Sequence, residues 1–355
     1  MTDSPGLNIV GLTDWLARAH PELADGPLSA QLITGGRSNL TYRIDGARTP
    51  LVLRRPPLGH VLSSAHDMAR EHRVIRALRD TRVPVPPTVD LVDDSESGLV
   101  TETPFFVMDL VEGRVLADPA QNSDFAPREL HDLSLSLADI LAELHTIPPA
   151  SVGLESFGRA DGYLQRQLGT WRRQLDSSRT REVPRLDELQ DGLGERMPEA
   201  GRSALVHGDY RLDNALVAGG RNGSTSGEAP RITAILDWEM ATIGDPLVDL
   251  GMLGLYWSIS ELPGGRGVAP SAVDLDAGYP AFDEIVDAYA ARAGITSPDL
   301  GWYRAFAAYK LAVILEGIHC RYRAGETVGD GFDRIGELVE PLAAEGLARS
   351  AGRGL

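Results

Sequence analysis

The 355-residue sequence has one cysteine and no long apolar run, and each scarcity excludes a class of protein. Cys320 has no partner for a disulfide within the chain, and we interpret it as a packing residue of a helix. No stretch of 18 apolar residues occurs, so no membrane-spanning helix is expected. The N-terminus lacks a basic start followed by an apolar core, so no signal peptide is predicted and a cytoplasmic location is the expectation.

Positive charge is also scarce. The chain carries 34 Lys and Arg against 51 Asp and Glu, a formal net charge of −17. Phosphate-rich surfaces repel such a chain, so neither nucleic acid nor an anionic membrane is expected as its main partner. A cationic substrate is compatible with this charge, but many soluble proteins are simply acidic. The length is sufficient for two lobes with separate cores.

The most informative segment is His207-Gly-Asp-Tyr-Arg-Leu-Asp-Asn214, followed by Ile235-Leu-Asp-Trp-Glu239. Asp209 lies two residues after a histidine, Asn214 lies five residues after Asp209, and Asp237 ends an apolar, β-rich run. This spacing matches the H-x-D-x-x-x-x-N catalytic loop of kinases and their downstream metal-binding Asp. Phosphoryl transfer needs one carboxylate near the attacking hydroxyl and further oxygen ligands for Mg²⁺. We therefore predict Asp209 as a catalytic residue and Asn214 and Asp237 as Mg²⁺ ligands.

Arg211 lies inside this loop and is also a candidate catalytic residue, because it could orient Asp209 or meet a substrate anion. The segment has two alternative interpretations. His-Gly-Asp by itself is a common polar turn. A metal-dependent hydrolase would need further His, Asp or Cys ligands, and the sequence has neither His-Glu-x-x-His nor a pair of cysteines.

An upstream segment, Leu32-Ile-Thr-Gly-Gly-Arg-Ser-Asn39, lies between two predicted strands and is a candidate phosphate loop. The adjacent Gly35 and Gly36 would let backbone N–H groups approach phosphate oxygens. Ser38 and Asn39 could add side-chain donors. The segment is not the G-x-G-x-x-G of protein kinases, so an ordinary hairpin turn is the alternative.

The next strand offers two adjacent cations, Arg54 and Arg55, where kinases place a cation for the α- and β-phosphates. Neighbouring strand residues point to opposite faces, so only one of them can face a nucleotide. We predict Arg54, which shares a face with Val52, and expect Glu71 on the following helix as its ion-pair partner. Arginine binds phosphate bidentately, so it can replace the usual lysine, although the two are not equivalent. A surface Arg–Glu pair is the alternative.

The order of predicted elements divides the chain into an α+β arrangement of two lobes. Residues 1–108 are predicted as a β-rich nucleotide-binding lobe, 109–113 as a hinge, and 114–355 as a mainly helical catalytic and substrate-binding lobe. Met108, Asp109 and Val111 would contact the nucleotide base through backbone groups, although a simple core strand is equally compatible with this segment. Helices are expected at 8–20, 65–78, 130–144, 161–176, 184–197, 246–259, 282–293, 300–323 and 332–348, and strands at 30–34, 40–44, 50–54, 89–92, 105–110 and within 204–237.

The motifs GGRSN, LVLR, AREHRVI, VMDLVEG, HGDYRLDN, ILDWE and GDPLVDLG together resemble the aminoglycoside phosphotransferase-like kinases over roughly residues 28–325. The resemblance implies the two-lobed fold of protein kinases, with Asp209 as the base and Asn214 and Asp237 as Mg²⁺ ligands. LRRPP, the pair Ala65-His66 and DWEMATIGDP look most like the branch found joined to acyl-CoA dehydrogenases. In GDPLVDLG, we interpret Asp245 and Asp249 as residues that cap a helix and brace the catalytic loop.

These observations predict an ATP- or GTP-dependent, Mg²⁺-dependent kinase that phosphorylates a hydroxyl of a small molecule. The narrower resemblance favours a hydroxyacyl-CoA or a related metabolite as the acceptor. An aminoglycoside or amino-alcohol kinase is one alternative. A nucleotide-binding pseudokinase is another, suggested by Arg54 and by the missing glycine-rich motif, although such a module has no need of Asp209.

Overall fold

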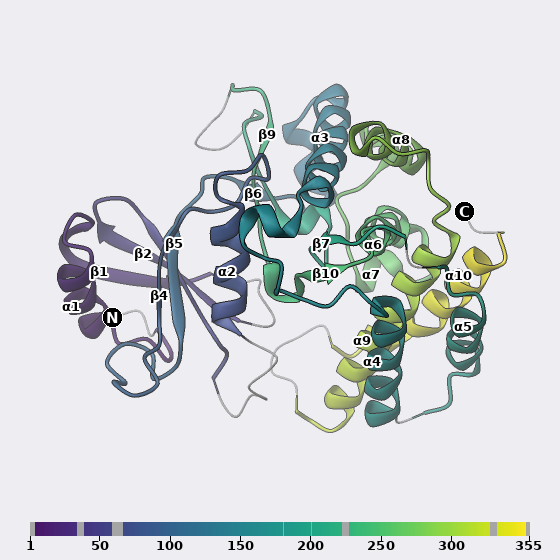
Figure 1. Cartoon of the computed structure of the whole chain (residues 1–355), viewed down its shortest axis with the longest axis horizontal. Coiled ribbons are helices and arrows are strands. Elements are labelled where there is room, and N and C mark those ends of the chain that lie inside the picture. Colours follow the sequence, from purple (N-terminus) through teal and green to yellow (C-terminus); the bar gives the residue numbers. More distant parts are fainter. Residues whose placement is uncertain are drawn as a thin grey trace. The chain divides into compact units, whose positions relative to one another are not determined.

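A computed structural model describes residues 4–33, 39–58, 67–179, 181–199, 201–221, 227–326 and 332–352. The chain divides into two compact units (Figure 1). The first comprises Met1–Glu112 together with Thr233–Ala241, and the second comprises Gly113–Ile232 and Thr242–Leu355. The short segment Thr233–Ala241, which contains Asp237, therefore groups with the N-terminal part of the chain.

The first unit is built on a five-stranded antiparallel sheet in the order β1-β2-β3-β5-β4. Alternate residues of its central strands, such as Leu51 and Leu53, point to one face and are fully buried there. Helix α1 covers this face with Leu12 and Leu16. The strands are β1 (Ala24–Leu32), β2 (Leu40–Ala47), β3 (Leu51–Arg55), β4 (Thr88–Val92) and β5 (Phe105–Asp109), and α1 spans Ile9–Ala19.

Helix α2 (Met68–Leu78) packs on the opposite face, beside β4 and β5 (Figure 1). Asp67 caps its start by accepting a hydrogen bond from the Arg70 N–H. The ring of His72 lies 5.9 Å from that of Phe106, a residue that alternates with the α1-facing side chains of β5. Arg54 belongs to this second face, because side chains alternate along β3.

The strand expected at 30–34 begins earlier, at Ala24, and ends at Leu32. Its first half contains Gly26 and Pro27, which are typical turn residues and hid the strand from sequence analysis. The structure accommodates them with a register shift between Ala24 and Ser29, where β1 bulges away from β2.

The second unit is mainly helical, and α9 runs through its middle against α4, α6 and α10 (Figure 1). Most of the residues of α9 are buried around its whole circumference, as expected for a central helix. Its approach to α6 is close, because a Cβ on Gly251 would lie 2.7 Å from the Tyr303 carbonyl. The α-helices are α3 (Pro127–Thr146), α4 (Tyr163–Ser178), α5 (Pro184–Glu195), α6 (Leu247–Ser258), α7 (Gly265–Val268), α8 (Phe282–Ala293), α9 (Gly301–Arg323) and α10 (Val339–Ser350).

Short strands hold the segment that sequence analysis identifies as the catalytic loop. In the second unit β7 (Ala204–Val206) pairs with β10 (Thr242–Gly244), and β6 (Arg114–Val115) pairs with β8 (Ala215–Ala218). The loop joins β7 to β8 and ends in a 3₁₀ turn at Leu212–Asn214. Strand β9 (Arg231–Ile235) then carries the chain from the second unit into the first.

The last helix was predicted over 332–348 but begins only at Val339, after a 3₁₀ turn at Ile335–Leu338. Pro341 explains the difference. A proline inside a helix would remove a hydrogen bond, whereas in the first turn its missing N–H costs nothing. Across the described residues, none of the helices combines the length and the apolar character needed to span a membrane.

Candidate active site

The catalytic loop of the second unit brings Asp209 and Asn214 into direct contact. The Asn214 amide nitrogen lies 2.8 Å from the Asp209 carbonyl oxygen and 3.2 Å from its Oδ2. Because the nitrogen donates in this way, the amide oxygen is the atom of Asn214 that can ligate a cation. The Asp209 side chain is 24% exposed, so it is accessible to a substrate.

Arg211 lies between two carboxylates of the same loop. Its Nε is 3.6 Å from Asp209 Oδ2, and its Nη1 is 3.5 Å from Asp213 Oδ2. Its guanidinium stacks 4.6 Å above the Tyr256 ring. Burial raises the pKa of Asp213, and the Arg211 charge only partly offsets this shift. The contacts with Asp213 and with the Tyr256 ring thus hold Arg211 beside Asp209.

Asp249, which is fully buried in α6, fixes the start of the loop. It accepts hydrogen bonds from the N–H groups of His207, at 2.6 Å, and Gly208, at 2.8 Å. His145 Nε2 lies 3.2 Å from the same carboxylate. Burial opposes ionisation of Asp249, but the hydrogen bonds and charges of His145 and His207 outweigh it and lower its pKa. Asp245 has a different role, because it accepts from Leu247 N–H at the start of α6.

In the first unit Arg54 is the centre of a charged cluster. Its Nε lies 3.0 Å from Glu71 Oε2, and its Nη2 lies 2.6 Å from Asp237 Oδ1 and 3.9 Å from Glu239 Oε2. Asn39 joins the cluster by donating to Glu239 Oε2 at 3.0 Å. Burial raises the pKa of Glu71 to about 7; Arg54 opposes this rise, and the charges of Asp237 and Glu239 add to it.

The neighbouring Arg55 points to the other face and has a structural environment. Only 4% of the residue is exposed, and its guanidinium donates to the carbonyl oxygens of Gly6 and Thr101. Two adjacent arginines of β3 therefore lie in unlike surroundings. Arg54 contacts carboxylates, whereas Arg55 donates to backbone oxygens, including that of Pro56.

The backbone of Asp237 is in the left-handed helical region, with φ 66° and ψ 58°. Among the described residues, Glu102 is the only other non-glycine with positive φ. Asp tolerates this conformation better than most residues, but it remains strained, and such strain tends to occur at functional positions. The turn aims the carboxylate toward Arg54 directly after β9.

Of the remaining candidates for nucleotide binding, the structure describes Met108, Asp109 and Val111. Gly35, Gly36 and Ser38 lie outside the described residues. Met108 is buried in β5, and burial raises the pKa of the Asp109 carboxyl. The N–H of Asp109 already donates to Pro87 O at 2.9 Å.

Comparisons with known proteins identify the family of this chain. Residues 29–306 match the phosphotransferase enzyme family. The chain belongs to this family. It is therefore a small-molecule phosphotransferase with a two-lobed, kinase-like α+β fold.

Three similar proteins illustrate the range of this phosphotransferase family. A crystal structure of a candidate aminoglycoside phosphotransferase from Ralstonia eutropha JMP134 is 30% identical, with a TM-score of 0.81 over 98% of this chain and 100% of that one. Acyl-CoA dehydrogenase family member 11 of Gallus gallus is 33% identical over 93% of this chain, and member 10 of Mus musculus is 33% identical over 90%. The chain spans only 41% and 29% of the length of these two relatives.

Two of the candidate residues each offer an oxygen ligand of the kind that a hard divalent cation takes. Asn214 and Asp237 offer an amide and a carboxylate oxygen, and Mg²⁺ takes oxygen ligands, usually one or two from the protein with the rest from water and phosphates. No cluster of three or more His, Cys, Asp or Glu suited to a metal occurs in the described part of the chain. The family chemistry does not require one, because the nucleotide supplies the other ligands.

Two residues of the phosphotransferase site were not assigned from the sequence. Glu239 contacts both Asn39 and Arg54, although only its position two residues after Asp237 could have drawn attention to it. Lys310 lies 102 residues after Gly208 in the sequence, and its Nζ donates to Gly208 O. The signal for Lys310 was compositional, because it is the single lysine of the chain.

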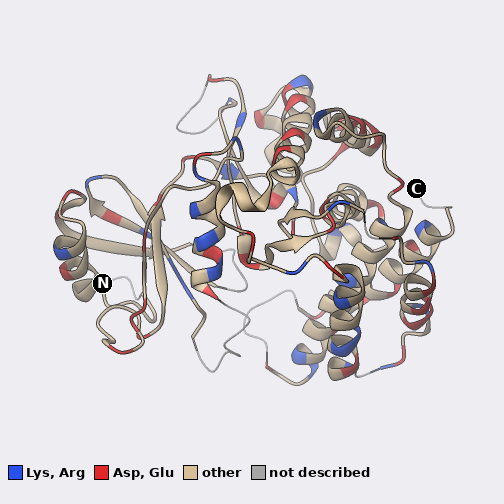
Figure 2. Ribbon diagram, in the orientation of Figure 1, with Lys and Arg blue, Asp and Glu red and all other residues tan. Residues whose placement is uncertain are grey.

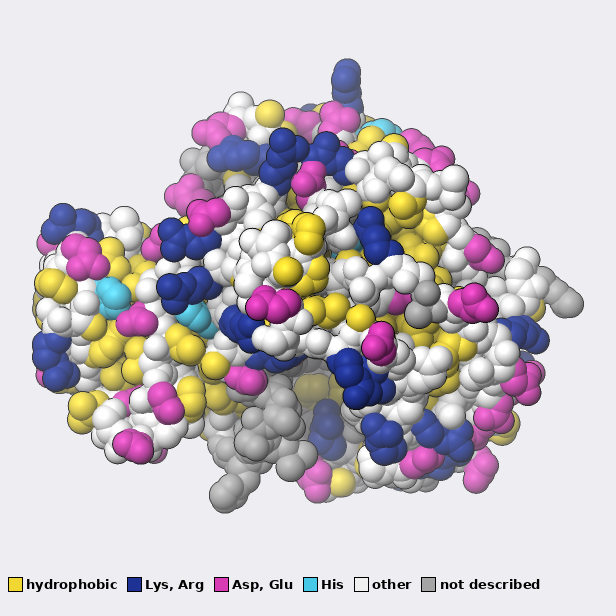
Figure 3. Space-filling view, in the orientation of Figure 1, with side chains coloured by type: hydrophobic (Ala, Val, Ile, Leu, Met, Phe, Trp, Pro, Cys, Tyr) yellow, Lys and Arg dark blue, Asp and Glu magenta, His cyan; other side chains and the backbone are white. Residues whose placement is uncertain are grey.

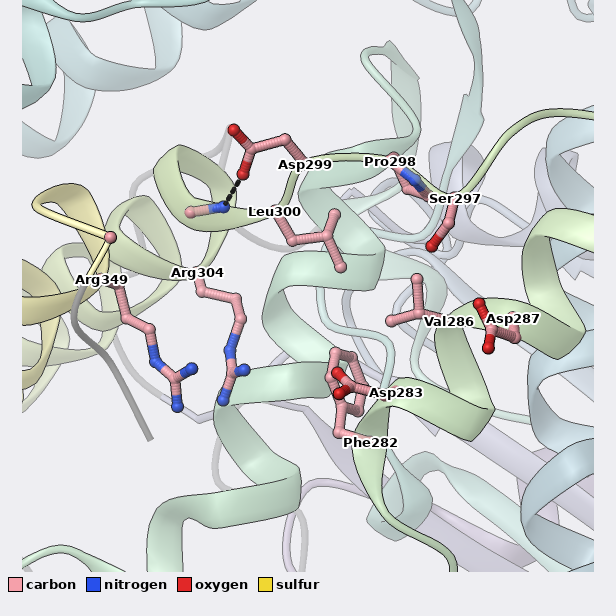
Figure 4. Close-up of a pocket in the computed structure, with 12 residues that line it drawn as sticks. Phe282, Asp283, Val286, Asp287, Ser297, Pro298, Asp299, Leu300, Arg304 and Arg349 are labelled. Carbon is pink, nitrogen blue, oxygen red and sulfur yellow. Dashed lines mark hydrogen bonds between the residues drawn. The ribbon is translucent and has the colours of Figure 1, made fainter.

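A separate hollow of about 510 Å³ lies in the second unit, beside α8, the start of α9 and the end of α10 (Figure 4). The guanidinium groups of Arg304 and Arg349 lie next to each other in this view, and Asp283, Asp287 and Asp299 also line the hollow. Burial and the Arg349 charge lower the pKa of Arg304 to about 10. None of the predicted site residues lines this hollow.

Proposed function

We propose that the protein transfers the γ-phosphoryl group of ATP or GTP to a hydroxyl of a small molecule. The observation that carries this proposal is the catalytic loop, in which Asn214 anchors Asp209 and keeps its own amide oxygen for a cation. Mg²⁺ held by Asn214 and Asp237 would neutralise negative charge on the transferred phosphoryl group. Asp209 would accept the hydroxyl proton as the new O–P bond forms and the bond to the β-phosphate breaks.

The other charged residues have positioning roles in this proposal. Arg211 would keep the Asp209 carboxylate oriented toward the acceptor. Arg54 would bind nucleotide phosphates while Glu71 holds its side chain in place, as its 3.0 Å ion pair suggests. Val111 would meet the nucleotide base, since the N–H groups of Asp109 and Leu110 are bonded to Pro87 and Pro50.

Replacement of Asp209 by Ala tests the reaction. We expect kcat to fall by at least about 10³-fold, because the hydroxyl loses its orienting base, while Mg·ATP affinity stays unchanged. Asp132→Ala, on the exposed surface of α3, is the matched control and is expected to behave like the unmodified protein. Near-normal turnover by Asp209→Ala would refute the assigned role.

For the acceptor we propose a hydroxylated acyl-CoA or a related metabolite. The curated relatives that match most of this chain are acyl-CoA dehydrogenase family members, which makes an acyl-CoA compound a natural candidate. A CoA ester is polyanionic, so it needs local basic groups despite the overall charge of −17. Figure 2 shows basic residues along α4. The candidate basic groups are Arg159, Arg166, Arg172, Arg173, Arg321 and Arg323.

Local contacts already use part of that basic charge. Arg166 donates to the carbonyl oxygens of Asp161 and Arg159, and Arg172 pairs with Asp176. On the face drawn in Figure 3, basic side chains form small groups among acidic ones rather than a broad field. A CoA moiety would therefore be recognised by a few arginines, not by the general surface potential.

An aminoglycoside or amino-alcohol acceptor is the second candidate. The acidic composition favours a polycation, and solved structures with the same fold include an aminopropanol kinase, at 18% identity and a TM-score of 0.60. A screen of nucleotide consumption against hydroxyacyl-CoAs, aminoglycosides and amino alcohols separates the two. Turnover confined to aminoglycosides would reject the acyl-CoA proposal and leave the kinase reaction standing.

A pseudokinase that only binds nucleotide is the third candidate, because Arg54 stands where many kinases have lysine. Mg²⁺-dependent nucleotide binding without turnover on any compound of that screen would favour it.

A further inference from the structure

Lys310 stands out by composition among the basic residues of the chain. Of the 34 basic residues it is the single lysine, and the other 33 are arginines. It lies in the middle of α9, and only 4% of it is exposed. Burying an ammonium group is costly unless it is paired, so its surroundings must compensate for lost hydration.

The Lys310 ammonium group contacts the backbone of the catalytic loop. Nζ donates to the Gly208 carbonyl oxygen at 2.6 Å, and the Gly208 N–H donates to Asp249 at 2.8 Å. Gly208 has φ 88°, a conformation suited to glycine. Its two backbone polar groups are therefore held by two buried, oppositely charged side chains from α6 and α9.

That carbonyl belongs to the peptide that joins Gly208 to Asp209. A rotation of this peptide would move the Asp209 N–H away from His207 Nδ1, which it meets at 3.2 Å, and would turn the Asp209 side chain. The direction of the Asp209 carboxylate thus depends on where the Gly208 oxygen is held.

The other contacts of Lys310 favour a compact ammonium over a guanidinium. Nζ lies 5.3 Å from the centroid of the Trp171 ring in α4, a favourable cation–π position. Burial lowers the pKa of Lys310, and the charges of Asp209 and Asp249 oppose this shift. A guanidinium would bring five donors in a rigid plane to a buried site in which the compact ammonium already meets the Gly208 carbonyl oxygen and the Trp171 ring.

We propose that Lys310 is a positioning residue for phosphoryl transfer, fixing the Gly208–Asp209 peptide so that the Asp209 carboxylate faces the acceptor hydroxyl. The proposal rests on the role proposed above for Asp209. It adds a residue outside the loop, on a helix that contributes none of the predicted catalytic, nucleotide-binding or metal-binding residues.

The lone lysine permits a structural test that is independent of activity. Protein labelled with [¹³C,¹⁵N]lysine gives the NMR signals of Lys310 and of no other side chain. We expect upfield-shifted side-chain protons from the Trp171 ring and slowly exchanging ammonium protons, and Trp171→Leu should remove the upfield shift. Signals like those of a solvent-exposed lysine would overturn the proposal.

A kinetic test uses hydrolysis of Mg·ATP with water as the acceptor. We expect Lys310→Met to lower kcat about 10- to 100-fold with unchanged Mg·ATP affinity, because the carboxylate is misdirected while the nucleotide contacts remain. Lys310→Arg keeps the buried positive charge and the fold, and we expect it to lower kcat as well. Tyr309→Phe is the matched control, since this adjacent α9 residue bonds instead to Gln190.

The outcomes separate this proposal from the proposed function. If Asp209→Ala abolishes hydrolysis and Lys310→Met leaves kcat unchanged, Lys310 does not position Asp209, although the kinase reaction stands. If Lys310→Met lowers kcat and Mg·ATP affinity together, its role is general support of the fold and the proposal is rejected. If no variant alters hydrolysis, the role of Asp209 itself is wrong.

Discussion

The catalytic loop of the second unit and the charged cluster of the first unit are held in opposite ways. The loop is fixed through its main chain, whose N–H and C=O groups bond to the buried side chains of Asp249 and Lys310. The cluster consists of side-chain ion pairs around Arg54, and one member, Asp237, is 32% exposed. Backbone bonds to buried partners keep their geometry, whereas ion pairs near solvent exchange partners easily.

This contrast has a consequence for ligand binding. Arg54 and Asp237 lie 2.6 Å apart, and both have proposed ligands, a phosphate for Arg54 and Mg²⁺ for Asp237. Under these proposed roles we expect their ion pair to rearrange when the nucleotide binds, while the loop around Asp209 needs no such change. We therefore expect rearrangement in the first unit and a preformed loop in the second.

The largest expected effect comes from removing the brace of the loop. Asp249→Ala leaves the N–H groups of His207 and Gly208 buried without an acceptor, and His145 without its carboxylate. We expect the free energy of unfolding to fall by about 3–5 kcal/mol. Urea denaturation of the variant measures this. Asp287→Ala, on the exposed surface of α8, is the control, and a comparably small loss in both variants would contradict the role of Asp249.

The next effect is a pH dependence centred on Glu71. Its pKa is raised from 4.5 to about 7 in the folded protein, mainly by burial. Between these values the folded state keeps the proton that the unfolded state has released, so the contribution of Glu71 to stability is largest below pH 4.5 and falls as the pH rises toward about 7. At its full value the shift corresponds to about 3 kcal/mol.

Glu71→Gln isolates this contribution, because the amide does not titrate. The difference in unfolding free energy between the two proteins should change across that pH window and be constant outside it. A difference that is flat with pH would show that Glu71 is ionised throughout.

The smallest expected effect is a loss of Mg·ATP affinity, which distinguishes the two arginines of β3. We expect Arg54→Met to weaken Mg·ATP binding about 10- to 100-fold, because a bidentate phosphate contact is lost. Arg55→Met should leave affinity unchanged and reduce stability instead, since it strands the carbonyl oxygens of Gly6 and Thr101. Calorimetric titration with Mg·ATP measures the affinity of both variants, and thermal unfolding measures their stability. Equal losses of Mg·ATP affinity in the two variants would contradict the assignment of Arg54 to the nucleotide and of Arg55 to a structural role.

Local rules recovered much of this molecule from its sequence. Strand alternation placed Arg54 and Arg55 on opposite faces, and helical position made Glu71 the partner of Arg54, as the structure has them. The two-lobed fold followed from the order of elements and from motifs, and the family comparison supports it. The assigned roles of Asp209, Asn214 and Asp237 remain predictions.

Other features depend on contacts that sequence spacing does not encode. The contact of Lys310 with Gly208 depends on how α9 packs inside the second unit, and the bond from Asn39 to Glu239 joins residues 200 positions apart. The early start of β1 was missed because Gly26 and Pro27 imitate a turn, and the late start of α10 was missed because Pro341 was read as an interior residue. Tertiary packing overrides local preference at such places.

The backbone at Asp237 also affects how this protein can be engineered. Glycine adopts positive φ without the strain that a side chain brings, so Asp237→Gly relaxes the turn after β9 while deleting the carboxylate. The same change removes the 2.6 Å ion pair with Arg54, and under the role proposed for Asp237 it would also remove a Mg²⁺ ligand. A library designed to stabilise the enzyme should hold residue 237 constant and seek its gains elsewhere.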